Sequence, residues 1–285
     1  MKKTFNFCLA AFALVSIISC DNGDDISAVP QPPSVAVGPN QMVYGLTETN
    51  ELLAFNANNP STFSSKTAIL GIPSGEKLLS IDFRPATGEL YALSNASKLY
   101  IVNTTTASAR VVSTSAFTPA ITGSIASIDF NPTVDRIRLV TNTGQNLRLN
   151  PETGVLAAMD TSIATTASIA GIAYTNSKSG ASSTILYDLD MTSGKLFKQD
   201  PPNNGTLVEV GSLGITFTGQ AAFDINPDNS IALVTATKDS KNNLYTVDLA
   251  NGKTTHIGSL SQKVIDLAIP TNPVAYAIDS TNALQ

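Results

Sequence analysis

One polar stretch of the chain has the residue types and spacing of a ligand-binding strand pair. Arg136 and Arg138 alternate with apolar residues, so both side chains lie on one face of a predicted strand. Asn146 and Arg148 share a face of the next predicted strand, and Gln145 stands beside them. Guanidinium and amide groups that face one another can hold a carboxylate or a sugar through fork-shaped hydrogen bonds. The alternative is that these side chains close a turn and form salt bridges between neighbouring units.

A second set of candidate residues consists of four aspartates that recur at one position of a sequence repeat: Asp82, Asp129, Asp224 and Asp266. Carboxylate oxygens are the ligands that Ca²⁺ prefers, so four of them near one axis could bind that ion. Alternatively, each carboxylate accepts hydrogen bonds from nearby backbone N–H groups. Their regular recurrence favours this structural role, since a binding site usually breaks the symmetry of a repeat. We therefore predict no cofactor and keep Ca²⁺ as the alternative.

The repeat that carries these aspartates also indicates the fold. The sequence S-I-D-F-R-P at 80–85 returns as S-I-D-F-N-P at 127–132 and as A-F-D-I-N-P at 222–227. Looser copies begin at Ser34 and Ile265. Equivalent positions in the six units are Ala36, Asp82, Asp129, Ala173, Asp224 and Asp266, separated by 46, 47, 44, 51 and 42 residues. Short strands repeated with a period in the forties are typical of the blades of a β-propeller.

Each unit is predicted to contain four short strands, which makes the protein all-β. In the second unit these are 80–83, 90–93, 98–102 and 110–113. Tyrosines recur on the predicted second strand, at Tyr44, Tyr91, Tyr187 and Tyr276, which favours a place in the core between blades. The last unit, 264–285, lacks its outer strands. We expect six blades, closed by residues just before Ser34 or by strands of the first unit. The alternative is five blades with merged terminal strands.

Three segments, 44–56, 80–93 and 129–154, carry a resemblance to a known family. They are similar to sequences of the bacterial family called domain of unknown function 4394. The resemblance extends over nearly all of the chain after its N-terminal region. It implies a secreted repeat protein of propeller type, and it implies no particular activity.

The N-terminal region has the pattern of a bacterial lipoprotein signal. Two lysines precede an apolar run at 5–18 that is too short to span a membrane stably. Ile17, Ile18 and Ser19 lead into Cys20, which resembles the lipobox and implies cleavage before Cys20 and lipidation of its thiol. The alternative is an ordinary signal peptide with an incidental cysteine.

The lipobox divides the chain into three predicted parts. Residues 1–19 are the signal peptide, and residues 20–33 are an acidic, proline-rich tether. Residues 34–285 form a single propeller domain. The acidic residues after Cys20 are similar to those of surface-exported lipoproteins of Bacteroidetes-type bacteria. We therefore favour the outer membrane or cell surface over the inner membrane, although an aspartate in this position marks inner-membrane retention in enterobacteria.

Composition narrows the class of partner. The net charge is −5 and no basic run occurs, so nucleic acid is a poor partner on electrostatic grounds. The only histidine, His256, falls on a predicted outer strand, and neither a G-x-S-x-G nor an H-E-x-x-H motif is present. An enzyme is therefore the less favoured interpretation. We expect a monomeric, lipid-anchored binding module for a glycan, a peptide or a protein. The alternative is a Ca²⁺-dependent hydrolase of the lactonase-like propeller type.

Overall fold

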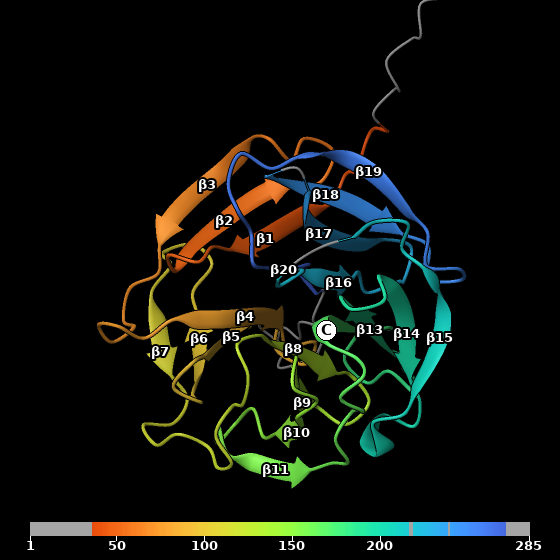
Figure 1. Ribbon diagram of the computed structural model, residues 1–285. Helices are drawn as coiled ribbons and strands as arrows, with labels where there is room; N and C mark the ends of the chain where they lie inside the picture. The colour runs from red at the N-terminus through yellow and green to blue at the C-terminus, as the bar shows by residue number, and fades with distance from the viewer. Residues whose placement is uncertain (1–35, 217–218, 239, 272–285) are drawn as a thin grey trace, which may run out of the picture. The chain divides into compact units, whose positions relative to one another are not determined.

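The computed structural model describes residues 36–216, 219–238 and 240–271. Within these residues the chain forms twenty β-strands and one short 3-10 helix. The strands make five four-stranded antiparallel sheets. The sheets surround a common axis as the blades of a β-propeller (Figure 1). The all-β propeller prediction is confirmed.

Each blade runs from an inner strand at the axis to an outer strand at the rim. Blade 1 contains β20 (Asp266–Ala268), β1 (Met42–Leu46), β2 (Glu51–Asn56) and β3 (Phe63–Ala68). Blade 2 contains β4 (Leu78–Phe83), β5 (Leu90–Ser94), β6 (Leu99–Val102) and β7 (Ala109–Val111). Blade 3 contains β8 (Ala126–Asn131), β9 (Arg136–Thr141), β10 (Asn146–Leu149) and β11 (Leu156–Met159). Blade 4 contains β12 (Ile169–Tyr174), β13 (Leu186–Asp190), β14 (Lys195–Gln199) and β15 (Leu207–Ser212), with the helix η1 (Pro202–Asn204) before β15. Blade 5 contains β16 (Phe223–Ile225), β17 (Ala232–Lys238), β18 (Lys241–Val247) and β19 (Thr254–Ser259).

The number of blades corrects our first prediction. The ring has five blades, not six, because β20 from the end of the chain pairs with β1 and becomes the inner strand of blade 1 (Figure 1). The alternative with merged terminal strands is the one observed. Residues 36–39, which we aligned with an inner strand, lie outside the strands. The merger gives β1 a neighbour on each side, which removes an open sheet edge at the axis.

The register of β20 corrects the alignment of the repeat as well. In blade 2, Asp82 lies opposite Tyr91, and in blade 1 it is Ala268 that lies opposite the equivalent Tyr44. Asp266 is therefore two residues away from the position of Asp82, and it stands at the level of Ser80. The copy of the repeat at Ile265 resembles the others in sequence but is shifted by two residues in the structure.

Other local predictions agree with the structure. The four strands expected in the second unit differ from those of blade 2 by one or two residues at their ends. Tyr91 and Tyr187 are buried between blades, and the Tyr91 ring meets Phe130 of blade 3 edge-on at 5.1 Å. His256 lies on the outer strand β19, as expected. Tyr276, Cys20 and the signal-peptide segment lie outside the described residues. None of the described residues belongs to a helix long and apolar enough to cross a membrane.

Candidate functional site

The inner strands are joined around the axis by side chains rather than by a backbone ladder. Inner strands of neighbouring blades are not hydrogen-bonded as a sheet, so N–H groups between them need other acceptors. The Ser80 hydroxyl accepts from the backbone N–H of Ile128 at 2.9 Å, and the Ser127 hydroxyl accepts from that of Ile172 at 3.1 Å. Asp266 occupies the equivalent position in blade 1, and its carboxylate accepts from Ile81 N–H at 2.8 Å and from the Ser80 hydroxyl.

A second level of links lies two residues further along each inner strand. Here the axial aspartates, defined as Asp82, Asp129 and Asp224, accept from the backbone N–H groups of the next blade. The three donors are Phe130 at 2.7 Å, Tyr174 at 3.0 Å and Ile269 at 2.6 Å, respectively. Each of the four aspartates that recur in the sequence therefore ties its blade to the next one.

Both kinds of link are missing between blades 4 and 5. Blade 4 has Gly171 and Ala173 at the two linking positions. A Cβ atom on Gly171 would stand 2.6 Å from the carbonyl oxygen of Ala221, so glycine permits a close backbone approach of β12 to β16. Close packing of the strands replaces the side-chain link at this step.

Burial makes ionisation of these carboxyl groups unfavourable. One oxygen from each axial aspartate lies within 4.8 Å of the others, and all three residues are buried. Burial raises the pKa of Asp224 to about 7 and that of Asp266 to about 8. Burial and repulsion from the neighbouring carboxylates raise the pKa values of Asp82 and Asp129 well above the usual range. Three carboxylates suit the oxygen preference of Ca²⁺, but each one is also engaged by backbone N–H groups.

The polar hairpin singled out in the sequence lies at the boundary between blades 3 and 4. Arg138 occupies the position of Tyr91 in blade 2 and Tyr187 in blade 4, and only 2% of its surface is exposed. Its guanidinium donates to Asp160 Oδ2 at 2.5 Å and to Asn203 Oδ1 at 2.7 Å. We call this region the blade 3–4 interface, and its polar members are Arg138, Asn146, Arg148, Asp160, Tyr174, Asp188, Gln199 and Asn203.

Two other predicted residues join Arg138 in this interface. Asn146 is buried, accepts from Arg138 at 2.9 Å and donates to the carbonyl of Pro202 at 3.0 Å. Arg148, at the solvent edge, donates to both carboxylate oxygens of Asp160 at 2.8 and 2.9 Å. Burial opposes ionisation of Asp160, but hydrogen bonds from Arg148 and Arg138 outweigh it and lower its pKa.

The remaining two predicted residues lie elsewhere. Arg136 donates to the carbonyl of Asp135 at 2.8 Å, within its own turn. Gln145 donates to the carbonyl of Ala120 at 2.9 Å and accepts from Thr122 N–H at 3.0 Å, which holds the loop before β8. The structure therefore brings three of the five predicted residues together and does not form one open face from all five.

Sequence reasoning missed five polar residues of the blade 3–4 interface: Asp160, Tyr174, Asp188, Gln199 and Asn203. Two of them stand out because they are buried and unpaired. Asp188 on β13 and Gln199 on β14 are at most 1% exposed. Both carboxyl oxygens of Asp188 and the Gln199 Oε1 atom have no hydrogen-bond partner among the described residues. Burial raises the pKa of Asp188 to about 8, although the charge of Arg138 opposes this. A comparison of strand registers between blades would have found them, whereas a search for motifs could not.

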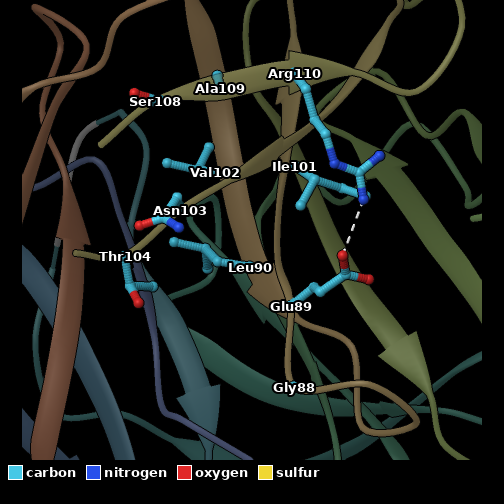
Figure 2. Close-up of a pocket in the computed structure, with 10 residues that line it drawn as sticks. All are labelled: Gly88, Glu89, Leu90, Ile101, Val102, Asn103, Thr104, Ser108, Ala109 and Arg110. Carbon is cyan, nitrogen blue, oxygen red and sulfur yellow. Dashed lines mark hydrogen bonds and ion pairs between the residues drawn. The ribbon is translucent and has the colours of Figure 1, made fainter. Parts of the chain in front are cut away.

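The described part of the chain has a cavity on blade 2 and another on blade 4. A cavity of about 430 Å³ lies on blade 2, where Leu90 and Val102 contribute to the wall and Glu89 pairs with Arg110 at 2.9 Å (Figure 2). A cavity of about 640 Å³ lies on blade 4, between residues 162–167 and the strands β14 and β15. The second cavity adjoins the blade 3–4 interface.

These features define the chain as a five-bladed β-propeller with a markedly polar boundary between blades 3 and 4. A family model described as Domain of unknown function (DUF4394) matches residues 51–268, and the chain belongs to that family. No curated protein matches the chain in sequence.

Several solved structures are similar in fold. A structural genomics protein of unknown function from Bacteroides thetaiotaomicron VPI-5482 is 13% identical, with a TM-score of 0.47, over 68% of this chain and 53% of that one. TolB from Acinetobacter baumannii is 12% identical, with a TM-score of 0.46, over 79% of this chain and 54% of that one. A chain of a nidogen/laminin complex is 12% identical, with a TM-score of 0.43, over 82% of this chain and 99% of that one. The matched region is about half the length of the first two proteins.

The buried carboxyl groups predict how stability depends on pH. Asp224, Asp266 and Asp188 have folded-state pKa values of about 7 to 8, above the ordinary value of 3.8, so folding takes up protons. The free energy of unfolding should therefore fall as the pH rises from about 4 to about 8. Asp160 acts in the opposite sense, and its contribution is lost as the pH falls below about 4.

Urea unfolding followed by circular dichroism at a series of pH values measures this dependence. Asp224→Asn should flatten the alkaline side of the curve, because it removes one of the titrating groups. A stability that stays constant or rises between about pH 5 and about pH 8 would contradict the assignment of protonated carboxyl groups to the axis.

Proposed function

We propose that this chain is a monomeric binding module, anchored by a lipid outside the cytoplasm, and that it recognises a glycan, a peptide or a protein at the blade 3–4 interface. One observation carries the proposal. At the boundary position where blades 1, 2 and 4 carry a tyrosine, blade 3 has Arg138, and polar residues from both blades gather around it. A binding site in a repeat protein is expected where the repeat is broken.

Hydrogen bonding within the interface supports a binding role over a purely structural one. Arg138, Asn146 and Asp160 satisfy one another, which explains their burial. Asp188 and Gln199 have unpaired acceptors, and an unpaired buried polar atom destabilises the folded state by about 1–3 kcal/mol. A residue that costs stability in this way is typical of a functional site.

The cellular location in this proposal rests on the sequence. The lipobox ending at Cys20, the acidic residues that follow it and the proline-rich tether support anchorage in the outer membrane or at the cell surface. The negative net charge and the lack of a basic run support a ligand other than nucleic acid.

A Ca²⁺-dependent hydrolase of the lactonase type is the second candidate function. Its support is the closeness of the axial aspartates, which have oxygens within 4.8 Å of one another. The same carboxylates accept backbone N–H groups from the next blade, which favours the binding module.

Glycan and peptide arrays probed with the detergent-solubilised full chain separate these two functions. A binding module should retain selected array members, with affinity reduced roughly tenfold in Arg148→Ala, because Arg148 forms the solvent edge of the interface. Arg110→Ala is the matched control, since this exposed arginine pairs with Glu89 on blade 2. Cleavage of array members that stops on addition of a chelator would instead establish the hydrolase. If array members are neither retained nor cleaved, both functions are contradicted.

Lipid anchorage is tested in cells with Cys20→Ala. The substitution removes the thiol that the lipobox presents, so labelled palmitate should no longer enter the protein and the protein should leave the membrane fraction. Protease treatment of intact cells should degrade the wild-type protein if it lies at the surface. Palmitate labelling of the variant at the wild-type level would contradict the proposed anchor.

A further inference from the structure

The cavity on blade 4 combines one aromatic wall with several small polar groups. Its lining includes the ring of Phe197, the hydroxyl residues Ser162, Thr166, Ser193 and Thr206, and Lys195. Lys195 pairs with Glu209 at 2.8 Å, so its charge is already compensated. The volume, about 640 Å³, is in the range of small-molecule sites.

Asp188 departs from the repeat at a position that is otherwise apolar. It lies opposite Ile172 of the inner strand. Residues in the same position of the other blades are Gly45, Ala92, Leu139 and Val234, which lie opposite Leu267, Ile81, Ile128 and Phe223. Only blade 4 has a charged or polar side chain at this buried position of the fold.

Gln199 is a second departure of the same kind. It lies opposite Leu207, the first residue of the outer strand β15. The residues of the other blades that lie opposite the first residue of the outer strand are Phe55, Val102, Leu149 and Val247. Blade 4 therefore replaces two apolar core residues by polar ones, and both are left with unpaired acceptor atoms.

Both residues lie next to the wall of the blade 4 cavity. Asp188 is the cross-strand neighbour of Phe197, and Gln199 is the cross-strand neighbour of Leu207. Directly paired residues of an antiparallel sheet point to the same face. Since Phe197 and Leu207 line the cavity, the unpaired acceptors lie on the face of the sheet that the cavity covers.

The chemistry of these groups restricts the ligand. The three unpaired oxygens are the carboxyl pair of Asp188 and the amide oxygen of Gln199. A carboxyl group that is protonated by burial both donates and accepts, so these atoms suit a ligand whose groups do both, such as hydroxyl groups. The charge of Arg138, which acts on Asp188, disfavours a cation beside that carboxyl group. A ring such as Phe197 packs against the C–H face of a sugar, while its hydroxyl groups reach polar side chains.

We propose that blade 4 binds a neutral hexopyranose in this cavity, with sugar hydroxyl groups donating to Asp188 and Gln199 and the sugar face stacked on Phe197. This inference rests on the proposed binding function and names the class of ligand. The proposal requires the half-buried side chain of Phe197, the cross-strand neighbour of Asp188, to turn so that the cavity reaches the carboxyl group.

Saturation-transfer NMR on the full chain tests the proposal, with D-galactose, D-mannose and N-acetyl-D-glucosamine as probes. At least one sugar should bind the wild-type protein. Its affinity should fall roughly tenfold or more in Asp188→Val, Gln199→Val and Phe197→Ala, because each variant removes one of the three contacts. Valine is the residue that blade 5 carries at both positions, so these two variants should fold. Thr104→Val, in the blade 2 cavity, is the control and should bind like the wild type.

Each outcome decides the proposal. Absence of binding by all three sugars, or binding that survives in Asp188→Val and Phe197→Ala, overturns it. If no sugar binds here while array binding depends on Arg148, the ligand class is wrong and the binding function stands. If neither assay detects binding, the proposed function fails as well.

Discussion

The hydrogen bond from a side-chain oxygen of one inner strand to a backbone N–H of the next is the interaction on which this propeller depends. Inner strands that are not paired in a sheet leave N–H groups exposed to a buried axis, and each one needs an acceptor. Ser80, Asp82, Asp129 and Asp224 supply acceptors, and Asp266 supplies one where the two ends of the fold meet. The recurring S-x-D sequence meets this requirement. Because the carboxyl groups are buried together, their pKa values are raised.

Because the five blades repeat one arrangement around an axis, a position at which one blade has a different residue is informative. The axial links are absent between blades 4 and 5, where Gly171 lets the strands approach directly. The boundary between blades 3 and 4 differs from the others by gaining polar residues. Arg138 stands where three other blades have tyrosine, and Asp188 stands where the other blades are apolar. We propose that these polar substitutions serve ligand recognition.

Much of the fold could be predicted from the sequence, because turn residues and alternating apolar residues act locally. The strands of blade 2 and the burial of the tyrosines follow from such patterns. The number of blades could not be predicted in this way. Closure of the ring depends on which strand pairs with β1, and that contact joins residues more than 200 positions apart. Arg138, Asn146 and Arg148 were identified because their types and alternation are visible in the sequence. Asp188 and Gln199 were missed. They are recognised as exceptions only when equivalent positions of the blades are compared, and the pairing of the strands defines which positions are equivalent.

The central claim is that the polar residues of the blade 3–4 interface are kept for binding, at the expense of stability. The free energy of unfolding of Asp188→Val at neutral pH tests it most directly. Valine at this position reproduces Val234 of blade 5 and removes two unpaired buried oxygens. We predict that the variant gains about 1–3 kcal/mol, while the matched reverse change Val234→Asp loses at least as much. A loss of stability in Asp188→Val would mean that the carboxyl group supports the fold, and it would contradict this account.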